Sequence, residues 1–500
     1  MDWLRSTVRS AYIFLTFAGC AFSQGAQARE KSEGLPPATV ATSPETAIVR
    51  ATLQQLLDTR ALGPTATYQR LGLRMGPAVQ SFYHTTDYSA RWTQASGWTP
   101  QAREALQLLG RAAEFGLVRE AYGWQHLTTL PDSLHRPASG KAKGRQLATF
   151  ELRLTDALVS YLYHLRQGHV APTTLQPTTP DSLTSQQLAQ RLHQALASPA
   201  LTAAVLAQQP AHLAYRRLQT IWSQALHTSP TDSARLMQDT VAGFRRVAIN
   251  LERMRWEAAA DSEYAEVNIP AYQLQIIRQG QVLQTYRVIV GKPELPTPVL
   301  SSRITVFVTA PEWRVPHSIA VREFLPEMQR DPSYLYDNHY RLYDGLGRRV
   351  SPWQVNWARV TPASFAYTIR QRAGSFNALG NVVFYFPNQQ RVFLHDTPGR
   401  AAFTRSERAL SHGCVRMEKP LKLAEYLLRR EDQPKRIKEF YASVQAHEKQ
   451  RFELTNGLPI HLRYYTCATD QGQLHFLPDI YNLDPLVTAA LFKTNNHLSK

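Results

Sequence analysis

The chain has 500 residues, which is too long for one ordinary core, so two or three domains are expected. A hydrophobic fraction of 43% with 19% charged residues is typical of a folded globular protein and excludes a disordered, collagen-like or coiled-coil chain. Lysine and arginine number 56 against 39 acidic residues, and this net charge of +17 favours polyanionic surroundings such as nucleic acid, acidic polymers or anionic wall material. Three cysteines cannot form a disulfide framework.

The N-terminus has the pattern of an export signal. Arg5 and Arg9 precede an apolar stretch too short to span a bilayer, and Ala26-Gln27-Ala28 supplies the small residues that a signal peptidase accepts. We expect a signal peptide over residues 1–28 and a flexible leader over residues 29–42. A second interpretation is cleavage before Cys20, which would then be lipidated and would anchor the protein in a membrane.

Residues 43–257 are expected to form a helical scaffold domain. Ser43-Pro44 and Thr99-Pro100 each place a capping residue before a proline at the first helical position. Further apolar stripes at helical spacing run over residues 154–165, and a last helix is expected over about 239–256, whereas polar loops are expected over 132–145 and 172–185. No recognisable chemistry occurs in this half.

The periodicity changes after Asp261 to that of strands. Strands are expected over residues 266–269, 272–277, 281–290, 303–308, 382–386 and 392–394, with Gln279-Gly280 as a hairpin turn. We assign residues 262–445 to a catalytic domain and residues 446–500 to a C-terminal extension. Residues 312–372 form a long insert rich in tryptophan and tyrosine, and they are expected to be a subdomain or a lid because a structureless insert of that length is improbable.

The chemical signal lies near residue 400. The chain reads Phe393-Leu394-His395-Asp396-Thr397-Pro398 and, after a loop, Leu410-Ser411-His412-Gly413-Cys414-Val415-Arg416-Met417. Cationic neighbours or a paired histidine can lower the pKa of a cysteine to about 3.5–7.5, and Gly413 allows backbone N–H groups to face an oxyanion. Two alternatives remain for these residues. Cys414 could be a buried structural cysteine, or His395, His412 and Cys414 could bind zinc, although their spacings do not match a known type of zinc site.

These residues resemble the signature of the L,D-transpeptidases with a YkuD-type catalytic domain. Similarity to the larger, periplasmic YcbB-type branch extends over Val290-Gly291-Lys292-Pro293, Thr297 to Ser302, Trp313 to Pro316, Asn377 to Gly380 and Asp479-Ile480-Tyr481. The resemblance implies an α+β chain, with a mainly helical N-terminal scaffold followed by a β-rich YkuD-type domain that carries an inserted capping subdomain. It implies no cofactor and no metal.

The resemblance also implies roles for individual residues. Cys414 would be the nucleophile and His395 the general base, with a backbone carbonyl near Asp396, and not its carboxylate, orienting the imidazole. Ser411, His412, Gly413 and Arg416 would support the motif loop, with the N–H groups of Gly413 and Cys414 facing the oxyanion. Asn377, Trp353 and Phe393 are candidate substrate contacts, and Phe393 stands where some relatives have tyrosine.

The implied partners are peptidoglycan stem peptides, a donor tetrapeptide and an acceptor amine, and the implied location is the periplasm or cell envelope. Formation of 3→3 cross-links is the leading expectation. Hydrolysis by an L,D-carboxypeptidase, tethering of a lipoprotein, and a non-catalytic wall-binding scaffold remain alternatives. Nucleic acid is not expected as a partner, because the chain is exported and has no binding motif. The stretch from Thr220 to Val247 is too short for the small wall-binding module common in this branch.

Overall fold

The computed structural model describes residues 44–94, 97–134, 140–227, 240–257, 261–470 and 472–493. The expected signal peptide (1–28), the leader (29–42) and Cys20 lie outside the described residues. Among the helices in the described ranges, none is both long and apolar enough to cross a membrane.

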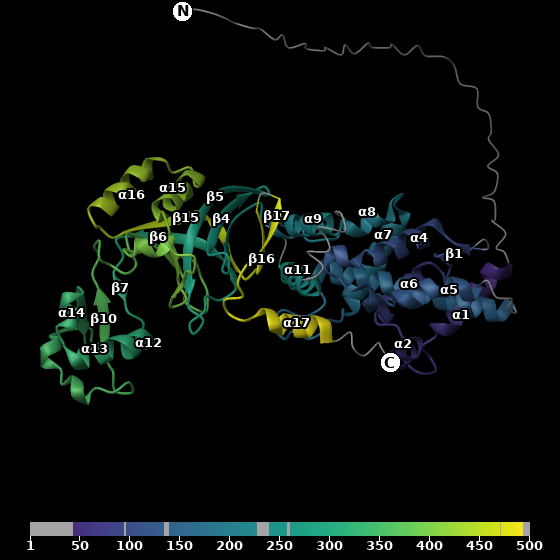
Figure 1. Ribbon diagram of the computed structural model, residues 1–500, viewed down its shortest axis with the longest axis horizontal. Coiled ribbons are helices and arrows are strands. Elements are labelled where there is room, and N and C mark those ends of the chain that lie inside the picture. The colour runs from purple at the N-terminus through teal and green to yellow at the C-terminus, as the bar shows by residue number, and fades with distance from the viewer. Residues whose placement is uncertain are drawn as a thin grey trace, which may run out of the picture. The chain divides into compact units, whose positions relative to one another are not determined.

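The N-terminal part is helical (Figure 1). Its helices are α1 (Pro44–Leu56), α2 (Pro64–Leu71), α3 (Gly76–Thr85), α4 (Pro100–Gly110), α5 (Trp124–Leu134), α6 (Gly140–Gln167), α7 (Ser182–Ala197), α8 (Leu201–Leu206), α9 (Leu213–His227) and α11 (Thr240–Arg255). Two 3-10 turns, η1 (Ala112–Phe115) and η2 (Arg119–Tyr122), and a small hairpin, β1 (Thr93–Gln94) with β2 (Gly97–Trp98), complete it. Most of α6 after Leu147 is buried, so this helix forms the centre of the core.

Local sequence signals account for several of these boundaries. The Thr99 hydroxyl accepts the N–H of Ala102 at 3.2 Å, as a helix cap does, and α4 starts at Pro100 as predicted. Gly116 adopts a left-handed conformation with φ of 65° and ends η1. The loop predicted over residues 132–145 is wrong at both ends, because α5 continues to Leu134 and α6 begins at Gly140.

The C-terminal part contains a large sheet. Its strands are β3 (Glu263–Asn268), β4 (Gln273–Arg278), β5 (Gln281–Gly291), β6 (Leu300–Thr309), β11 (Val382–Tyr385), β12 (Leu394–His395), β13 (Ala409–Ser411), β14 (Val415–Met417) and β15 (Gln450–Arg463). Their order is β13-β5-β14-β12-β11-β6-β15-β3-β4, and β4 also pairs with β5, so the sheet closes on itself. Gln279 and Gly280 both have positive φ and make the predicted hairpin turn between β4 and β5.

One face of this sheet is covered by α15 (Pro420–Arg430) and α16 (Lys435–Gln445). Phe307 of β6 stacks on Phe452 of β15 with ring centroids 4.8 Å apart, and Phe440 of α16 meets the Phe307 ring edge-on. The predicted fold class, a helical N-terminal domain followed by a β-rich domain, is confirmed.

The segment after residue 445 contributes to this same sheet. β15 lies between β6 and β3, antiparallel to the first and parallel to the second. Residues 450–463 of the expected C-terminal extension are therefore an integral part of the catalytic sheet. The extension continues through a hairpin, β16 (Cys467–Asp470) and β17 (Gln473–Phe476), to α17 (Asp484–Lys493).

The insert forms a subdomain with its own core. A four-stranded sheet has the order β7 (Trp313–Arg314), β10 (Thr368–Gln371), β8 (Tyr340–Tyr343) and β9 (Arg349–Val350). Short helical segments accompany it: α12 (His317–Ile319), the π-helical turn η3 (Ala320–Phe324), α13 (Leu325–Arg330), α14 (Tyr334–Asp337), η4 (Pro352–Gln354) and η5 (Trp357–Arg359). Trp357 is buried in its core, Trp313 is partly buried against it, and Trp353 is 60% exposed.

The last scaffold helix is bonded to the C-terminal segment. Asn250 of α11 exchanges two hydrogen bonds with Thr466, at 2.7 and 2.9 Å. Arg253 pairs with Asp484 at 2.6 Å, and the same carboxylate accepts the Thr466 hydroxyl at 2.8 Å. Cys467 is buried at this junction, where it contacts the Asn250 amide at 3.3 Å.

Candidate active site

The motif residues lie on or beside two paired strands of the large sheet. Val383 and Arg416 lie opposite His395 on the neighbouring strands, and Phe384 and Val415 lie opposite Leu394. Leu394, Phe384 and Val415 belong to the core. Because side chains alternate along a strand, His395 and Arg416 face away from that core. Cys414 directly precedes β14 and is partly buried against the core.

The pairing of these two strands brings the segments that carry His395 and Cys414 together. Cys414 directly precedes Val415, whose N–H donates to the Phe393 carbonyl at 3.0 Å, two positions before His395. Nineteen positions separate the two residues in the sequence, and the parallel pairing of β12 with β14 brings their segments together.

The His395 ring is fixed by the backbone beside it. Nδ1 donates a hydrogen bond to the carbonyl oxygen of Asp396 at 2.6 Å, which leaves Nε2 as an acceptor. The ring is only 5% exposed. Burial and the charge of Arg416 lower the pKa of His395 to about 3, so the imidazole is neutral at neutral pH.

The Cys414 thiol is also neutral in the resting protein. Burial raises the pKa of Cys414 to about 11, although the backbone of Phe393 and the charge of Arg416 both act to lower it. The sequence analysis notes that cationic neighbours can lower the pKa of a cysteine, but here burial outweighs the charge of Arg416, and two other arginines near the turn are engaged elsewhere. Arg400 pairs with Asp396 at 2.8 Å, and Arg408 donates to backbone carbonyls and stacks on Tyr272.

A set of hydrogen bonds holds the loop that carries the cysteine. The Ser411 hydroxyl donates to the Cys414 carbonyl at 2.6 Å and accepts the Gly413 N–H at 3.2 Å. On the other side, the Thr297 hydroxyl donates to the Gly413 carbonyl at 2.8 Å and accepts the Gly291 N–H at 2.8 Å. Gly413 has φ of 108°, a conformation that other residues rarely adopt.

These bonds change the expected oxyanion site. The Gly413 N–H already has Ser411 as its acceptor, so it is not free as the sequence analysis expects. The Cys414 N–H donates to no acceptor among the described residues. Because the C=O and N–H of one trans peptide unit point in opposite directions, Thr297 aims this N–H by binding the Gly413 carbonyl. Cys414 N–H is the better candidate donor.

Arg416 and Phe393 flank the thiol. Arg416 is half-buried, and its Nε has no hydrogen-bond partner among the described residues, so it can bind a substrate carboxylate. The Phe393 ring lies 5.6 Å from the rings of both His395 and Tyr385. The hydroxyl that some relatives have at position 393 is missing, but Tyr385 on the next strand is close enough that the thiolate charge affects its pKa.

A groove continues from Tyr385 across the same face. It has a volume of about 550 Å³ and is lined by Val306 and Val308 of β6, Lys449 and Arg451 beside them, and Glu312 at the start of the insert. Val306 lies opposite Tyr385, and Arg451 opposite Val308. A cationic groove thus begins two strands from Cys414.

The capping subdomain touches the motif through His412. Its Nε2 lies 2.5 Å from Oε1 of Glu323, which belongs to η3. The predicted supporting role of His412 therefore includes a contact that the sequence did not indicate, between the cysteine loop and the insert.

Two candidate substrate contacts lie elsewhere. Asn377 is fully buried, and its amide donates to the carbonyls of Pro311 and Arg372, at 3.0 and 2.7 Å. It ties the two ends of the insert together and has no access to a ligand in this conformation. Trp353 is exposed on the capping subdomain, where its ring lies 6.4 Å from that of Tyr336.

The Asp396 carboxylate is occupied by structural bonds, and the sequence analysis gives it no role in orienting the imidazole. It accepts two hydrogen bonds from Asn381, both at 2.9 Å, and one from Thr397 at 2.8 Å, besides the ion pair with Arg400. In the described residues, no group of three histidine, cysteine, aspartate or glutamate side chains is arranged to hold a metal ion.

The sequence analysis did not identify the role of Thr297 or the contact with Tyr481 that holds this residue in place. The Tyr481 hydroxyl donates to the Gly291 carbonyl at 2.6 Å and accepts the Thr297 N–H at 3.1 Å. Both residues lie in stretches already quoted for their resemblance, and this was the only signal available. Their contact with the cysteine loop depends on tertiary structure.

Two segments of the chain match known protein families. Residues 262–439 match the YkuD family, described as the L,D-transpeptidase catalytic domain. Residues 77–221 match a family described as a scaffold domain.

Individual relatives agree with the first match. A curated protein from Haemophilus influenzae, named "Putative L,D-transpeptidase", is 37% identical over 225 residues. The aligned part spans 45% of this chain and 45% of that relative, less than half of its length.

Solved structures resemble the chain more weakly. An L,D-transpeptidase from Mycobacterium smegmatis is 13% identical, with a TM-score of 0.19 over 41% of this chain and 60% of that one. L,D-transpeptidase 1 from Mycobacterium tuberculosis is 14% identical, with a TM-score of 0.15 over 41% of this chain and 63% of that one. Scores this low carry no argument about this protein.

Proposed function

Residues 262–439 belong to the YkuD family of L,D-transpeptidase catalytic domains, as the motif predicts, and we propose that this protein is a peptidoglycan L,D-transpeptidase that forms 3→3 cross-links. The observation that supports the proposal is the parallel pairing of β12 with β14, which brings the segment of a half-buried thiol beside that of a neutral imidazole, near a cationic groove. Its substrates are the peptide stems of the wall.

The first half-reaction forms a thioester. Cys414 Sγ attacks the carbonyl carbon between the diamino acid and the terminal D-alanine of a tetrapeptide stem, while Nε2 of His395 takes the thiol proton. The oxyanion faces the Cys414 N–H. When the C–N bond breaks, His395 returns the proton to the leaving amine and D-alanine departs.

The second half-reaction transfers the acyl group. The side-chain amine of a neighbouring stem attacks the thioester carbonyl and loses a proton to His395. The C–S bond then breaks, and the proton returns to sulfur. Because both residues are neutral at rest, the proton moves only as a substrate approaches, and a stable thiolate is not required.

We propose that residues 312–372 act as a lid that limits hydrolysis. Transfer to an amine needs a site from which water is excluded. The His412–Glu323 contact joins this subdomain to the cysteine loop, and Glu312 at its start lines the groove. Arg416, Lys449 and Arg451 attract the stem carboxylates to the groove beneath it.

We further propose that the protein is exported and acts in the periplasm or cell envelope, with residues 43–257 as the scaffold. Lipidation at Cys20 would add a membrane anchor.

The test is muropeptide analysis after incubation of the full-length protein with tetrapeptide-rich sacculi. The proposal predicts 3→3 dimers together with release of D-alanine. Tripeptides without dimers would assign the protein to the L,D-carboxypeptidases. Transfer to a lipoprotein amine in place of a stem would identify a tethering enzyme.

The matched control is Cys414→Ala, with Cys467→Ala as a second cysteine variant. Identical products from wild-type protein and Cys414→Ala would support a non-catalytic wall-binding scaffold instead. Cys467→Ala should keep full activity per folded molecule, because that thiol is buried at the junction with α11.

A further inference from the structure

The helical scaffold contains a cavity of about 560 Å³, a size typical of sites for small ligands. Three segments distant in sequence form it: the turn between α2 and α3, the stretch from η2 into α5, and the middle of α6. Nothing in the proposed reaction uses this cavity.

The floor of the cavity is buried and carries one carboxylate, that of Asp156; burial raises its pKa to about 6, and the charge of Arg74 acts to lower it. Tyr122, Leu127 and Ala157 are 4%, 1% and 4% exposed, and Asp156 is 8% exposed. The Asp156 carboxylate is held in place, because its Oδ1 accepts the Met75 N–H at 2.7 Å. A fixed, buried carboxylate is suited to bind an ammonium group.

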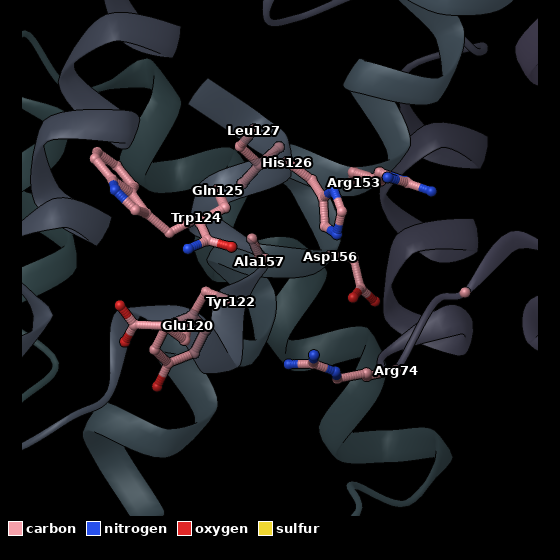
Figure 2. A pocket seen from close by; sticks show the side chains of 12 residues that line it. Arg74, Glu120, Tyr122, Trp124, Gln125, His126, Leu127, Arg153, Asp156 and Ala157 are labelled. Carbon is pink, nitrogen blue, oxygen red and sulfur yellow. The ribbon is translucent and has the colours of Figure 1, made fainter. Parts of the chain in front are cut away.

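The rim carries positive charge. Arg74 and Arg153 are exposed, and neither forms an ion pair with a carboxylate in the described part of the chain. The rim carboxylate, Glu120, is already paired with Arg119 at 2.9 Å. Figure 2 shows the side chains of Arg74 and Asp156 directed into the same space, with Tyr122 and Glu120 on the other side.

An aromatic wall completes the cavity. Trp124 opens α5 and packs closely on Gly110, where any larger residue would collide with its ring. The indole is therefore held in position and can cover the aliphatic part of a ligand. The cavity thus combines a buried anion, two unpaired rim cations and a fixed apolar wall.

We propose that this cavity is a second, non-catalytic binding site for a peptide stem, in which Asp156 binds the ammonium group of its diamino acid and Arg74 and Arg153 bind its carboxylates. The choice of ligand rests on the proposed function, which supplies a substrate with these charges on an aliphatic chain. A second site on the same chain raises the effective concentration of peptide stems near Cys414.

The test uses calorimetric titration of the full-length Cys414→Ala protein with the synthetic tripeptide L-alanyl-γ-D-glutamyl-diaminopimelate. This probe lacks the terminal D-alanine and cannot acylate the enzyme. We expect Arg74→Gln combined with Arg153→Gln to weaken tripeptide binding at least tenfold. Arg103→Gln, an exposed arginine of α4 away from the cavity, is the matched control and should bind as the parent does.

Two further probes identify what the cavity recognises. Acetylation of the side-chain amine of the tripeptide should weaken binding to the parent protein. Free diaminopimelate, if it binds as tightly as the tripeptide, would show that the cavity takes the free amino acid, and the stem assignment would be wrong. Unchanged binding in the double arginine variant would overturn the proposal directly.

The outcome is separable from the fate of the proposed function. Acylation of Cys414 by a carbapenem in the wild-type background should be the same with and without the two arginine substitutions. Loss of tripeptide binding without loss of acylation supports the second site. If acylation and cross-linking occur but the titration is unaffected, only the second site is refuted. A protein that binds the tripeptide at these arginines but never acylates would retain the site and lose the enzyme assignment.

Discussion

The helical scaffold and the catalytic sheet both bury ionisable side chains, but they leave them with different hydrogen-bonding capacity. Glu151 of α6 is fully buried, and burial raises its pKa. Its carboxylate accepts hydrogen bonds from the N–H groups of Arg91, Trp92 and Thr93 and from the hydroxyls of Tyr83 and Thr93, at 2.7–2.9 Å. Nothing remains for a substrate.

The catalytic pair differs in this respect. His395 uses one ring nitrogen for Asp396 and keeps the other as an acceptor, while the Cys414 N–H has no acceptor among the described residues. A shifted pKa is therefore common to both regions, and unused hydrogen-bonding capacity separates the candidate site from a structural cluster. The following predictions test this difference.

His395→Gln should reduce acylation of Cys414 by about 10²–10⁴-fold, because a general base contributes a factor of this size. Circular dichroism should show an unchanged fold. Acylation at the wild-type rate would show that the imidazole is merely a structural residue, like Glu151, and the comparison would fail.

Glu151→Ala should lower stability and leave acylation unchanged, which is the reverse of the effects expected for His395→Gln. Several buried donors lose their acceptor at about 1–3 kcal/mol each, so the free energy of unfolding should fall by about 3 kcal/mol or more. Acylation per folded molecule should be unchanged. Chemical denaturation gives the first quantity and titration of active sites the second; a selective loss of acylation would contradict the assignment of Glu151 to structure.

His395 should make stability depend on pH. Its pKa falls from the ordinary value of 6.5 to about 3 in the folded protein, so the unfolded chain binds more protons between these values. Stability contributed by this residue is therefore present above about pH 6.5 and is lost as pH falls towards 3, by about 2 kcal/mol between pH 6 and 4.

Other groups titrate in this range, so the measurement is a difference. The difference in the free energy of unfolding between wild-type protein and His395→Gln should become smaller as pH falls, because the variant lacks the titrating imidazole. A difference that stays constant with pH would mean that the pKa of His395 is not depressed.

Thr297→Val should slow acylation about tenfold. The valine removes the hydroxyl that binds the Gly413 carbonyl, so the Cys414 N–H loses its fixed direction. Thr297→Ser keeps that hydroxyl and should restore the rate. If serine fails to rescue a valine variant that is folded, the hydrogen bond does not position the loop.

Glu323→Gln should have the smallest effect. A partly exposed contact of this kind contributes up to about 1 kcal/mol, so the ratio of hydrolysed to cross-linked product should rise by no more than about fivefold. Chromatography of the muropeptides gives this ratio. Glu327→Gln on α13, whose partner Arg330 lies within the subdomain, is the matched control.

The sequence predicts several long strands of the large sheet but misses many short ones, and it also misses the long strand β15. β5 and its hairpin with β4 follow the expected ranges closely. β15 was not predicted, because a register shift between Glu453 and Leu458 interrupts the alternation of buried and exposed side chains. Phe452, Leu454, Ile460 and Leu462 otherwise show this alternation. A bulge of this kind breaks the two-residue period from which strands are predicted.

The same contrast holds at the site. Cys414 and His395 were identified because a short motif carries their chemistry. The depressed and raised pKa values, the engaged Gly413 N–H and the Glu323 contact follow from burial and from neighbours distant in sequence, which no local pattern contains.

The most direct test of the central claim is intact-mass spectrometry of the protein after exposure to a carbapenem. The protein has two cysteines in its described part, Cys414 half-buried on the sheet face and Cys467 buried at the scaffold junction. We predict one covalent adduct per chain, present in Cys467→Ala and absent in Cys414→Ala. An adduct that persists in folded Cys414→Ala, or that maps to Cys467, would contradict the assignment of Cys414 as the nucleophile.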